Sequence, residues 1–460
     1  MIKKTIIFFS FLLFFFLFDL TFGYSLRGEN ENSEGEVTEV PVVDLSNDIF
    51  EFEEFSSFEH TVKNFMQYWG VKGASVAIAK DGKLVYAKGF GYANIEENDL
   101  MQPYHLLRVA SVSKLITAAA VMKLVENERL LLDSKVFGPA GILSDKKLYS
   151  YIDSRVEEIT VKQLLNHSAG WTSQWGDHLF MHESIARQQG IELPIEKNDI
   201  IQFALAKRLH YTPGARSSYS NLGYIILESV IEKVSGLSYE AYVTQNIFNP
   251  IGIYDAFIAH NYDSLRYPLE VRYYEVPEAQ PIPAFDGEPQ MVLKSRGGND
   301  IRTLGAAGGW VISSVSLIKF LVAIDPERDG GIISNESAAT LAQAEPGKHP
   351  LGWRWVSVDG SRWRTGSFAG TSALAISRSD GFSFVFLTNT SPWVGSRFPY
   401  QVNRMMARAL HRVEEWPEIF PYSPYSPKLF TEVELQDYNQ DKSKPWDNWE
   451  FLSLINANVN

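Results

Sequence analysis

The sequence predicts an α+β protein in which one antiparallel sheet packs against helices and a helical region is inserted in the middle of the chain. Two observations support this fold class. Apolar runs separated by Asp-Gly pairs, the turn signal of antiparallel hairpins, occur near both ends of the chain. Helix-like stretches, joined by loops rich in Gly, Pro and Trp, lie between these ends.

Three Asp-Gly pairs mark the expected hairpins, at Asp81-Gly82, Asp359-Gly360 and Asp380-Gly381. The apolar runs beside them, which we expect to form strands, lie at 74–79, 84–87, 353–356, 363–364, 373–376 and 382–387. Helices are expected at 161–165, 221–235, 314–324 and 400–415.

The first 23 residues have the pattern of a secretory signal peptide: Lys3 and Lys4, an apolar stretch over 6–18, and small residues at the end. An uncleaved membrane anchor is the alternative, because Thr21 and Gly23 depart from the usual alanine pair before a cleavage site. We therefore expect a secreted, extracellular or periplasmic protein, and a membrane-bound one only if this segment is retained.

The rest of the chain divides by composition into three parts. Residues 24–57 are predicted to be an acidic, flexible leader. Residues 58–415 are predicted to be one folded domain, and residues 416–460 a C-terminal extension rich in Pro, Asp and Asn.

Composition excludes several classes of protein. The net charge of −13 argues against nucleic acid or an anionic membrane surface as the main partner. With no cysteine, the chain has no disulfide, no thiol nucleophile and no cysteine-zinc site. His178 and His182 have a metal-like spacing, but no further ligand is placed beside them, so we expect no metal and no cofactor.

The strongest chemical signal is Ser111 followed three residues later by Lys114, at the front of an alanine-rich apolar helix. This spacing places a hydroxyl and an amine on one helical face. A serine needs a neighbouring base to become a nucleophile, and a lysine can act as that base only when it is neutral. Burial beside Leu115 and Ile116 would lower the lysine pKa and favour the neutral form.

The same Ser-x-x-Lys pattern occurs at two other places. Ser144 and Lys147 lie in a polar stretch that is typical of a surface loop. Ser316 and Lys319 are typical of an ordinary helix start with Ser316 as its N-cap. The pattern alone is weak, and only Ser111 precedes a helix of small apolar residues.

A second motif, Tyr219-Ser220-Asn221, follows a loop that contains Pro213 and Gly214. A tyrosine hydroxyl beside a lysine can pass protons, and an amide two residues later can bind a substrate carbonyl. The alternative is a loop tyrosine followed by an asparagine helix cap.

With these motifs the chain resembles the class C beta-lactamase-like serine hydrolases of the beta-lactamase and penicillin-binding-protein superfamily. The resemblance covers about 58–414 and depends on blocks that occur in family order, at 76–91, 108–114, 159–170, 211–224 and 307–310. It implies Ser111 as the acylated nucleophile, Lys114 as its base, Tyr219 as the partner in proton transfer and deacylation, and Asn221 near the substrate.

The family's third motif, Lys-Thr-Gly or His-x-Gly, is replaced here by Arg364-Thr365-Gly366-Ser367. The resemblance implies an oxyanion hole from the N–H groups of Ser111 and Ser367, and substrate binding by Arg364, Thr365 and Gly366. The glycine would let the substrate backbone approach. Arginine can bind a carboxylate but cannot shuttle a proton, so this departure affects the substrate most. The alternative is a strand arginine paired with a surface acid.

These features predict an exported serine hydrolase that forms an acyl-enzyme at Ser111 and acts on a small-molecule or peptide substrate with an ester or amide bond. Carboxylesterase, D,D-peptidase and beta-lactamase activities stay open, because the fold does not decide between them. The alternative is a non-catalytic protein that keeps the pocket to bind cell-wall peptides or a partner.

Overall fold

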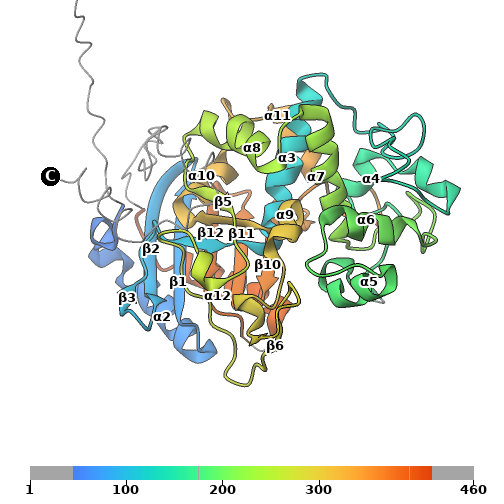
Figure 1. Ribbon diagram of the computed structural model, residues 1–460. Coiled ribbons are helices and arrows are strands. Elements are labelled where there is room, and N and C mark those ends of the chain that lie inside the picture. Colours follow the sequence, from blue (N-terminus) through green and yellow to red (C-terminus); the bar gives the residue numbers. More distant parts are fainter. Residues whose placement is uncertain (1–44, 175, 393, 417–460) are drawn as a thin grey trace, which may run out of the picture. The chain divides into compact units, whose positions relative to one another are not determined.

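The computed structural model describes residues 45–416 except 175 and 393 (Figure 1). The predicted signal peptide (1–23), most of the predicted leader (24–57) and the extension from residue 417 lie outside the described residues. In the described part of the chain, no helix combines the length and the apolar character needed to cross a membrane.

Seven antiparallel strands form the main sheet, in the order β3-β2-β1-β12-β11-β10-β9 (Figure 1). Strands from the two ends of the chain meet at its centre, where β1 pairs with β12. The strands are β1 Gly73–Lys80, β2 Lys83–Asn94, β3 Asp99–Leu100, β9 Trp355–Val356, β10 Arg362–Phe368, β11 Thr371–Ser377 and β12 Phe382–Thr388. The predicted class, an antiparallel sheet with helices, is confirmed.

The three Asp-Gly pairs that mark the expected hairpins all lie at turns between paired strands, as predicted. Asp81 and Gly82 both have positive φ, 49° and 76°, which a tight turn between right-twisted strands requires. Gly360 and Gly381, with φ of 87° and 84°, turn the chain between β9 and β10 and between β11 and β12.

The predicted helices at 161–165, 221–235, 314–324 and 400–415 are present as α4, α7, α10 and α12, with small shifts at their ends. The helices are α2 Ser56–Trp69, α3 Ser113–Glu126, α4 Val161–Leu165, α5 His182–Gln189, α6 Lys197–Leu205, α7 Leu222–Ser235, α8 Tyr239–Val243, α9 Ile301–Gly308, α10 Ser314–Ala323, α11 Asn335–Ala342 and α12 Phe398–Leu410. Helices α3 to α9 lie between the strands of the two chain ends in sequence, as the inserted helical region predicts.

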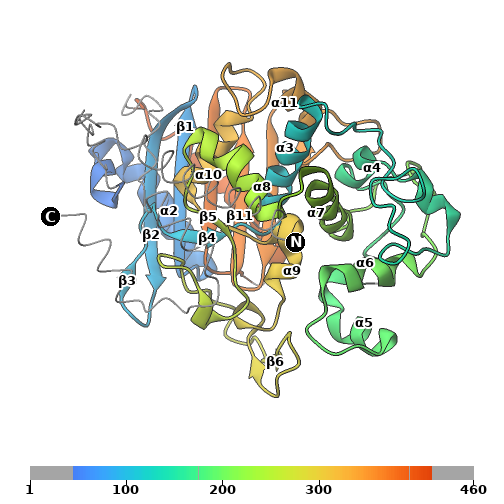
Figure 2. The same cartoon turned by 45° about the horizontal axis from the view of Figure 1, so that its top comes forward.

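Helices cover both faces of the main sheet (Figures 1 and 2). On one face, the hydroxyl groups of Ser75 in β1 and Ser314 in α10 are 2.7 Å apart. The next residue, Val76, points to the other face because side chains alternate along a strand. Its cross-strand partner Phe386 meets Phe65 of α2 there, with ring centroids 6.4 Å apart. The central strands are therefore buried on both sides.

A small second sheet leads the chain into the predicted site. It consists of β4 Leu106–Arg108, β8 Trp310–Ser313 and β5 Ala256–Ile258, in the order β4-β8-β5. The Val109 amide continues this pairing by donating to the Trp310 carbonyl at 3.0 Å. A short pair, β6 Ile282–Pro283 and β7 Met291–Val292, lies apart from it. The end of β4 therefore fixes the position of the turn that contains Ser111.

Helix α3 is buried on every side over its first ten residues, 113–122. It packs against α7, α8 and α9, so no face of this stretch reaches solvent (Figure 2). An apolar helix without a polar face is typical of a central core helix. Lys114 is carried into the core by this packing, because it lies in the first turn of α3.

The sequence predicts that the residues up to 57 form a flexible leader. In the structure, the last part of this segment is folded instead. Two short 3₁₀ turns, Asn47–Phe50 and Glu53–Phe55, precede α2, and Phe50 and Phe55 are fully buried. Both rings pack on Tyr86 of β2, with centroids 5.8 and 4.7 Å away. The acidic composition of this segment conceals its apolar contacts, and the folded unit includes residues from Leu45 onward.

Replacing Phe55 with alanine should lower the free energy of unfolding by about 3–5 kcal/mol, since it removes a fully buried ring. Phe52→Ala is the matched control: Phe52 is 41% exposed, and we expect a loss of about 1 kcal/mol or less. Urea unfolding of the two variants measures both values. Equal, small losses would show that residues 45–57 are not part of the folded core.

Candidate active site

Ser111 lies in a 3₁₀ turn, Ala110–Val112, which directly precedes α3. The residue before it, Ala110, has a φ of 48°, a left-handed conformation that is strained for any residue with a Cβ atom. Ala110 is fully buried, so the surrounding structure holds it in this conformation. The turn presents Ser111 next to the first turn of α3 rather than within it.

A buried arginine at the end of β4 anchors the entry to this turn. The Arg108 guanidinium donates to the carbonyls of Ser295 (2.8 Å) and His260 (2.9 Å) and lies 3.5 Å from the Glu270 carboxylate. The Arg108 backbone amide donates to the Tyr273 hydroxyl at 2.9 Å. Apart from the Ser295 carbonyl, these partners of the Arg108 side chain and backbone all lie in one segment of the chain, residues 260–273.

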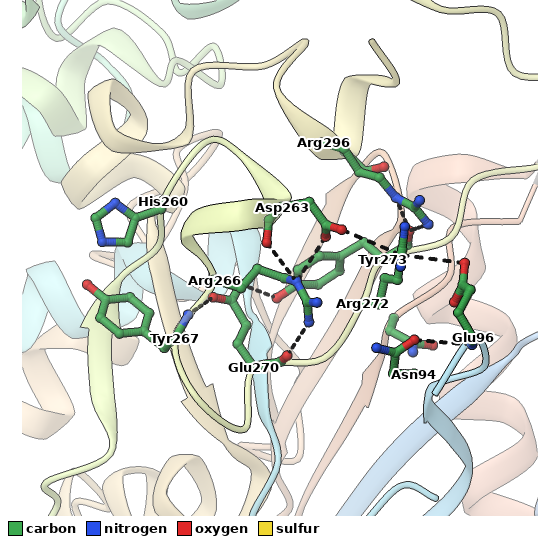
Figure 3. Close-up of polar contacts among 12 residues, drawn as sticks. Asn94, Glu96, His260, Asp263, Arg266, Tyr267, Glu270, Arg272, Tyr273 and Arg296 are labelled. Carbon is green, nitrogen blue, oxygen red and sulfur yellow. Dashed lines mark hydrogen bonds and ion pairs between the residues drawn. The ribbon is translucent and has the colours of Figure 1, made fainter. Parts of the chain in front are cut away.

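That segment, residues 260–273, is braced by its own polar contacts (Figure 3). Arg266 pairs with Asp263 at 2.9 Å and donates to the Glu270 carbonyl. The Glu270 carboxylate accepts from the Tyr267 amide at 3.1 Å and from the Tyr273 hydroxyl at 2.9 Å. The position of Ser111 therefore depends on a polar network that no sequence motif indicates.

The Lys114 amine is completely enclosed and has three oxygen neighbours. Its Nζ lies 2.7 Å from Asn221 Oδ1 and 3.3 Å from Ser111 Oγ, and it also donates to the Ala307 carbonyl. A neutral lysine has two N–H hydrogens and one lone pair. The two carbonyl-type oxygens can only accept, so they take both hydrogens and leave the lone pair directed at Ser111.

Burial lowers the pKa of Lys114 from its ordinary value to about 8. The negative charge that Tyr219 can carry opposes this shift, while the Arg364 guanidinium adds to it. A substantial neutral fraction is therefore present near physiological pH, which a general base needs.

The Ala307 carbonyl is held in place by an irregularity in α9. Gly305 has non-helical backbone angles (φ 29°, ψ −114°), and a Cβ atom there would lie 2.1 Å from Glu228 Oε2. The same Glu228 oxygen accepts from the Ala306 amide at 2.7 Å, and Lys197 Nζ pairs with the other oxygen at 2.8 Å. A buried, paired carboxylate thus orients the carbonyl that faces Lys114.

The Tyr219 hydroxyl lies on the other side of Ser111. It donates to Ser111 Oγ at 2.8 Å and is itself 3.2 Å from Arg364 Nη2. Burial raises the pKa of the Tyr219 phenol, but the charges of Lys114 and Arg364 outweigh burial and bring the pKa down to about 8. Tyr219 can therefore accept or return a proton near neutral pH.

Arg364 is buried and faces the site, so the alternative of a surface arginine paired with an acid is wrong. Its Nε donates to the Ser111 carbonyl at 2.8 Å, and within the described residues no carboxylate lies within ion-pair distance of it. The side chain instead links the turn that carries Ser111 to Tyr219. Arg364 therefore brings a positive charge to the site, and no carboxylate of the described residues pairs with it.

Gly366 has a structural role in addition to the substrate approach expected for it, which stays a prediction. A Cβ atom at Gly366 would lie 2.2 Å from the Val109 carbonyl oxygen and 3.0 Å from the Ser111 amide nitrogen. The glycine is thus required by the approach of β10 to the turn that carries Ser111, before any substrate binds. Thr365 and Ser367 flank it on β10, and the assignment of the Ser367 N–H to an oxyanion hole stays a prediction.

The structure therefore gathers Ser111, Lys114, Tyr219, Asn221 and Arg364 around one point, and places Thr365, Gly366 and Ser367 on the strand beside it. Asn221 begins α7 as its N-cap residue, but its side chain makes no capping bond. The amide faces Lys114 instead, so the capping alternative does not account for it.

His167 packs against Tyr219, with ring centroids 4.5 Å apart. It is buried, and its Nδ1 lies 3.2 Å from both the backbone nitrogen and the carbonyl oxygen of Ser220. Burial lowers the pKa of His167 well below its ordinary value, so the ring is neutral. His167 therefore packs against Tyr219 as a neutral ring.

Sequence reasoning missed three residues beside the site. Asp177 accepts from Asn221 Nδ2 at 2.7 Å. Arg354 lies over the Tyr219 ring with Cζ 5.1 Å from the centroid, and its Nη1 is 3.4 Å from His349 Nε2. Of these three residues, only Arg354 could have been found from the sequence. The predicted hairpin at Asp359-Gly360 places Arg354 opposite Arg364, and cross-strand partners lie on the same face of a sheet.

The other two Ser-x-x-Lys matches have no such surroundings. Ser144 and Lys147 are exposed in a loop, as predicted. The expected N-cap at Ser316 is wrong by three residues: Ser313 caps α10, and the Ser316 hydroxyl donates to the buried Asp255. Among the residues that the structure describes, no three His, Asp or Glu side chains gather as a metal-binding group.

The chain matches the model of a known protein family and is similar to curated proteins. The family model described as Beta-lactamase matches residues 58–403. Protein flp of Staphylococcus aureus is 28% identical over 214 residues, which is 45% of this chain and 40% of that protein. The chain thus spans less than half the length of this curated relative.

Two solved structures have similar folds. The octameric penicillin-binding protein homologue of Pyrococcus abyssi has a TM-score of 0.58 and 27% identity, with 78% of each chain covered. D-amino acid amidase of Ochrobactrum anthropi SV3, solved with L-phenylalanine amide, has a TM-score of 0.61 and 20% identity. That alignment covers 79% of this chain and 99% of the amidase chain, and it shows a shared fold.

The geometry predicts that Arg364 contributes, after Lys114, to the lowered pKa of Tyr219. Subtracting the tyrosinate absorbance titration of Tyr219→Phe from that of the wild type should isolate one phenol with a midpoint near pH 8. In an Arg364→Met background the same difference should move toward the ordinary tyrosine value of about 10, because a nearby positive charge is lost. A midpoint unaffected by this substitution would exclude Arg364 as the cause.

Proposed function

This chain belongs to the beta-lactamase family, and we propose from this premise that it is a serine hydrolase that forms an acyl-enzyme at Ser111 and cleaves an ester or amide. The observation that carries the proposal is the placement of Ser111 Oγ between the Lys114 amine at 3.3 Å and the Tyr219 hydroxyl at 2.8 Å. A pocket kept for binding alone has no need for both groups at one serine.

In the first step, neutral Lys114 takes the hydroxyl proton of Ser111 as Oγ attacks the substrate carbonyl carbon. The carbonyl oxygen becomes an oxyanion, which the N–H groups of Ser111 and Ser367 would stabilise. Collapse of this intermediate breaks the bond to the leaving alcohol or amine, which receives through Tyr219 the proton that Lys114 took. Water then attacks the acyl-enzyme carbonyl and gives one proton to the Lys114–Tyr219 pair. Collapse of this second intermediate releases the acid and returns that proton to Ser111 Oγ.

The charge of the site favours a substrate that carries an anionic group. Arg364 is buried, Arg354 is half-buried, and among the described residues neither lies within ion-pair distance of a carboxylate. Both guanidinium groups lie over the Tyr219 ring, at 5.1 and 5.6 Å. A substrate carboxylate would supply the missing counter-charge, and arginine binds carboxylates in a bidentate geometry.

Export is part of the proposal, and only the sequence supports it. The basic and apolar pattern of residues 1–23 has the form of a secretory signal peptide. This assignment implies that the substrate is extracellular or periplasmic.

Intact-mass labelling with a fluorophosphonate and with a penicillin tests the mechanism. We expect one fluorophosphonate adduct per wild-type chain and none on Ser111→Ala, because only this serine has a base beside it. Ser144→Ala is the matched control, since it removes the serine of an exposed Ser-x-x-Lys pair and should label like the wild type. Labelling that persists in Ser111→Ala would place the nucleophile elsewhere.

The two probes also separate the remaining alternatives. A folded wild-type protein that takes up neither reagent would contradict the covalent mechanism and support the non-catalytic binding protein. Penicillin uptake without ester hydrolysis would favour a cell-wall peptide as the substrate. Fluorophosphonate uptake together with ester turnover would favour the carboxylesterase.

Arg354, rather than Arg364, is the residue with which to test substrate charge. Arg364 also contacts Ser111 and Tyr219, so its loss should slow every substrate. Arg354→Gln should lower kcat/KM about tenfold for an ester that carries a carboxylate, since one charge-assisted interaction is lost. The neutral isosteric ester should change about twofold or less, and Arg354→Lys should retain part of the preference. Equal losses for both esters would refute this role.

A further inference from the structure

We propose that Asp177 is a positioning residue: it fixes the Asn221 amide in the one orientation that leaves the lone pair of Lys114 free to receive the Ser111 proton. The inference rests on the proposed function, because it concerns the base of that reaction. It adds a residue from a different part of the chain, the loop before the 3₁₀ turn His178–Phe180.

Asn221 forms a bridge between Asp177 and Lys114. Its Nδ2 donates to Asp177 Oδ2 at 2.7 Å, and its Oδ1 accepts from Lys114 Nζ at 2.7 Å. The residues come from three elements, the loop before His178–Phe180, the start of α7 and the first turn of α3. The contacts join them into one chain of hydrogen bonds.

The carboxylate decides which end of the amide faces Lys114. An asparagine amide is nearly symmetric in shape, but its oxygen only accepts and its nitrogen only donates. An ionised carboxylate only accepts, so Asp177 requires the NH₂ end of Asn221. The oxygen must then face Lys114.

This orientation has a direct consequence for the lysine. With Asn221 Oδ1 and the Ala307 carbonyl as acceptors, both hydrogens of neutral Lys114 are engaged and its lone pair points at Ser111. A reversed amide would present an N–H donor to Lys114. The lone pair would then accept that hydrogen and would no longer be available to Ser111.

Asp177 is itself held in place, and no cation of the described residues competes with Asn221 for its carboxylate. Its Oδ1 accepts from the Leu179 amide at 3.1 Å, which caps the short 3₁₀ turn. Among the described residues, no lysine, arginine or histidine nitrogen lies within 4.0 Å of its carboxylate. The half-buried Asp177 is therefore committed to Asn221 on one oxygen and to the loop backbone on the other.

Asp177 also acts on Lys114 through its charge, since a negative charge raises the pKa of the lysine. The other groups facing Lys114 are Tyr219 from the loop before α7, which raises its pKa, and Arg364 of β10, which lowers it. The aromatic face of Tyr224 in α7 lies 5.4 Å away, and neutral His167 is also close. Replacing Asp177 changes only one of these contributions.

The test is the pH dependence of the second-order rate at which a small fluorophosphonate labels Ser111 in the full-length protein, measured by intact mass. In the wild type this rate should rise with pH through about 8, as Lys114 becomes neutral. Asp177→Asn keeps an acceptor and a capping side chain but removes the charge, so the midpoint should move to lower pH. Asp177→Ala should also lose about tenfold in the high-pH plateau, the effect of one lost orienting hydrogen bond.

Two further variants separate positioning from a purely structural role. Asp177→Glu, which retains the carboxylate, should restore both midpoint and plateau in part. In an Asn221→Ala background, Asp177→Ala should cause no further loss of plateau rate, because Asp177 acts through the missing amide. Additive losses, or an unmoved midpoint in Asp177→Asn, would overturn the inference while leaving the proposed function intact. A wild type that is not labelled at Ser111 would overturn both.

Discussion

The burial of a lysine amine in the core is the constraint on which the rest of the site depends. Helix α3 is enclosed over its first ten residues, so Lys114 enters the interior without access to water. A buried amine must find hydrogen-bond partners within the protein. Asn221 and Ala307 provide them, and both are held by carboxylates, Asp177 directly and Glu228 through the backbone of α9. Lys114 and the residues that support it thus form one hydrogen-bonded unit.

The second feature of the site is an excess of positive charge around one phenol. Lys114, Arg354 and Arg364 all lie within 6 Å of the centre of the Tyr219 ring. Gathering like charges in a buried region is unfavourable unless something offsets it. Here the lowered pKa of Tyr219 makes a phenolate available as a partial counter-charge. An incoming carboxylate would complete the balance, which connects substrate choice to the acid-base state of the site.

The two regions that hold Ser111 and Lys114 are built from distant parts of the sequence. The strained turn at Ala110 is held by Arg108 and the segment 260–273, and by the approach of Gly366 on β10. Each contact joins residues more than a hundred positions apart. Such contacts are invisible to periodicity and turn signals, which report only neighbours along the chain. This explains why Asp177 and Glu228 were not found, although the motifs that they support were.

The sequence by itself determined the antiparallel sheet, its three Asp-Gly turns and the central helices. It also determined the order of the Ser-x-x-Lys, Tyr-x-Asn and third motifs. These features depend on local pattern and short spacing along the chain. The sequence did not reveal the packing of Phe50 and Phe55, since acidic neighbours conceal two apolar contacts. Only the tertiary structure decided that Arg364 faces Ser111 and Tyr219 and that Gly366 allows β10 to approach the turn that carries Ser111. The direction of a strand side chain follows from which face is buried, and that depends on long-range packing.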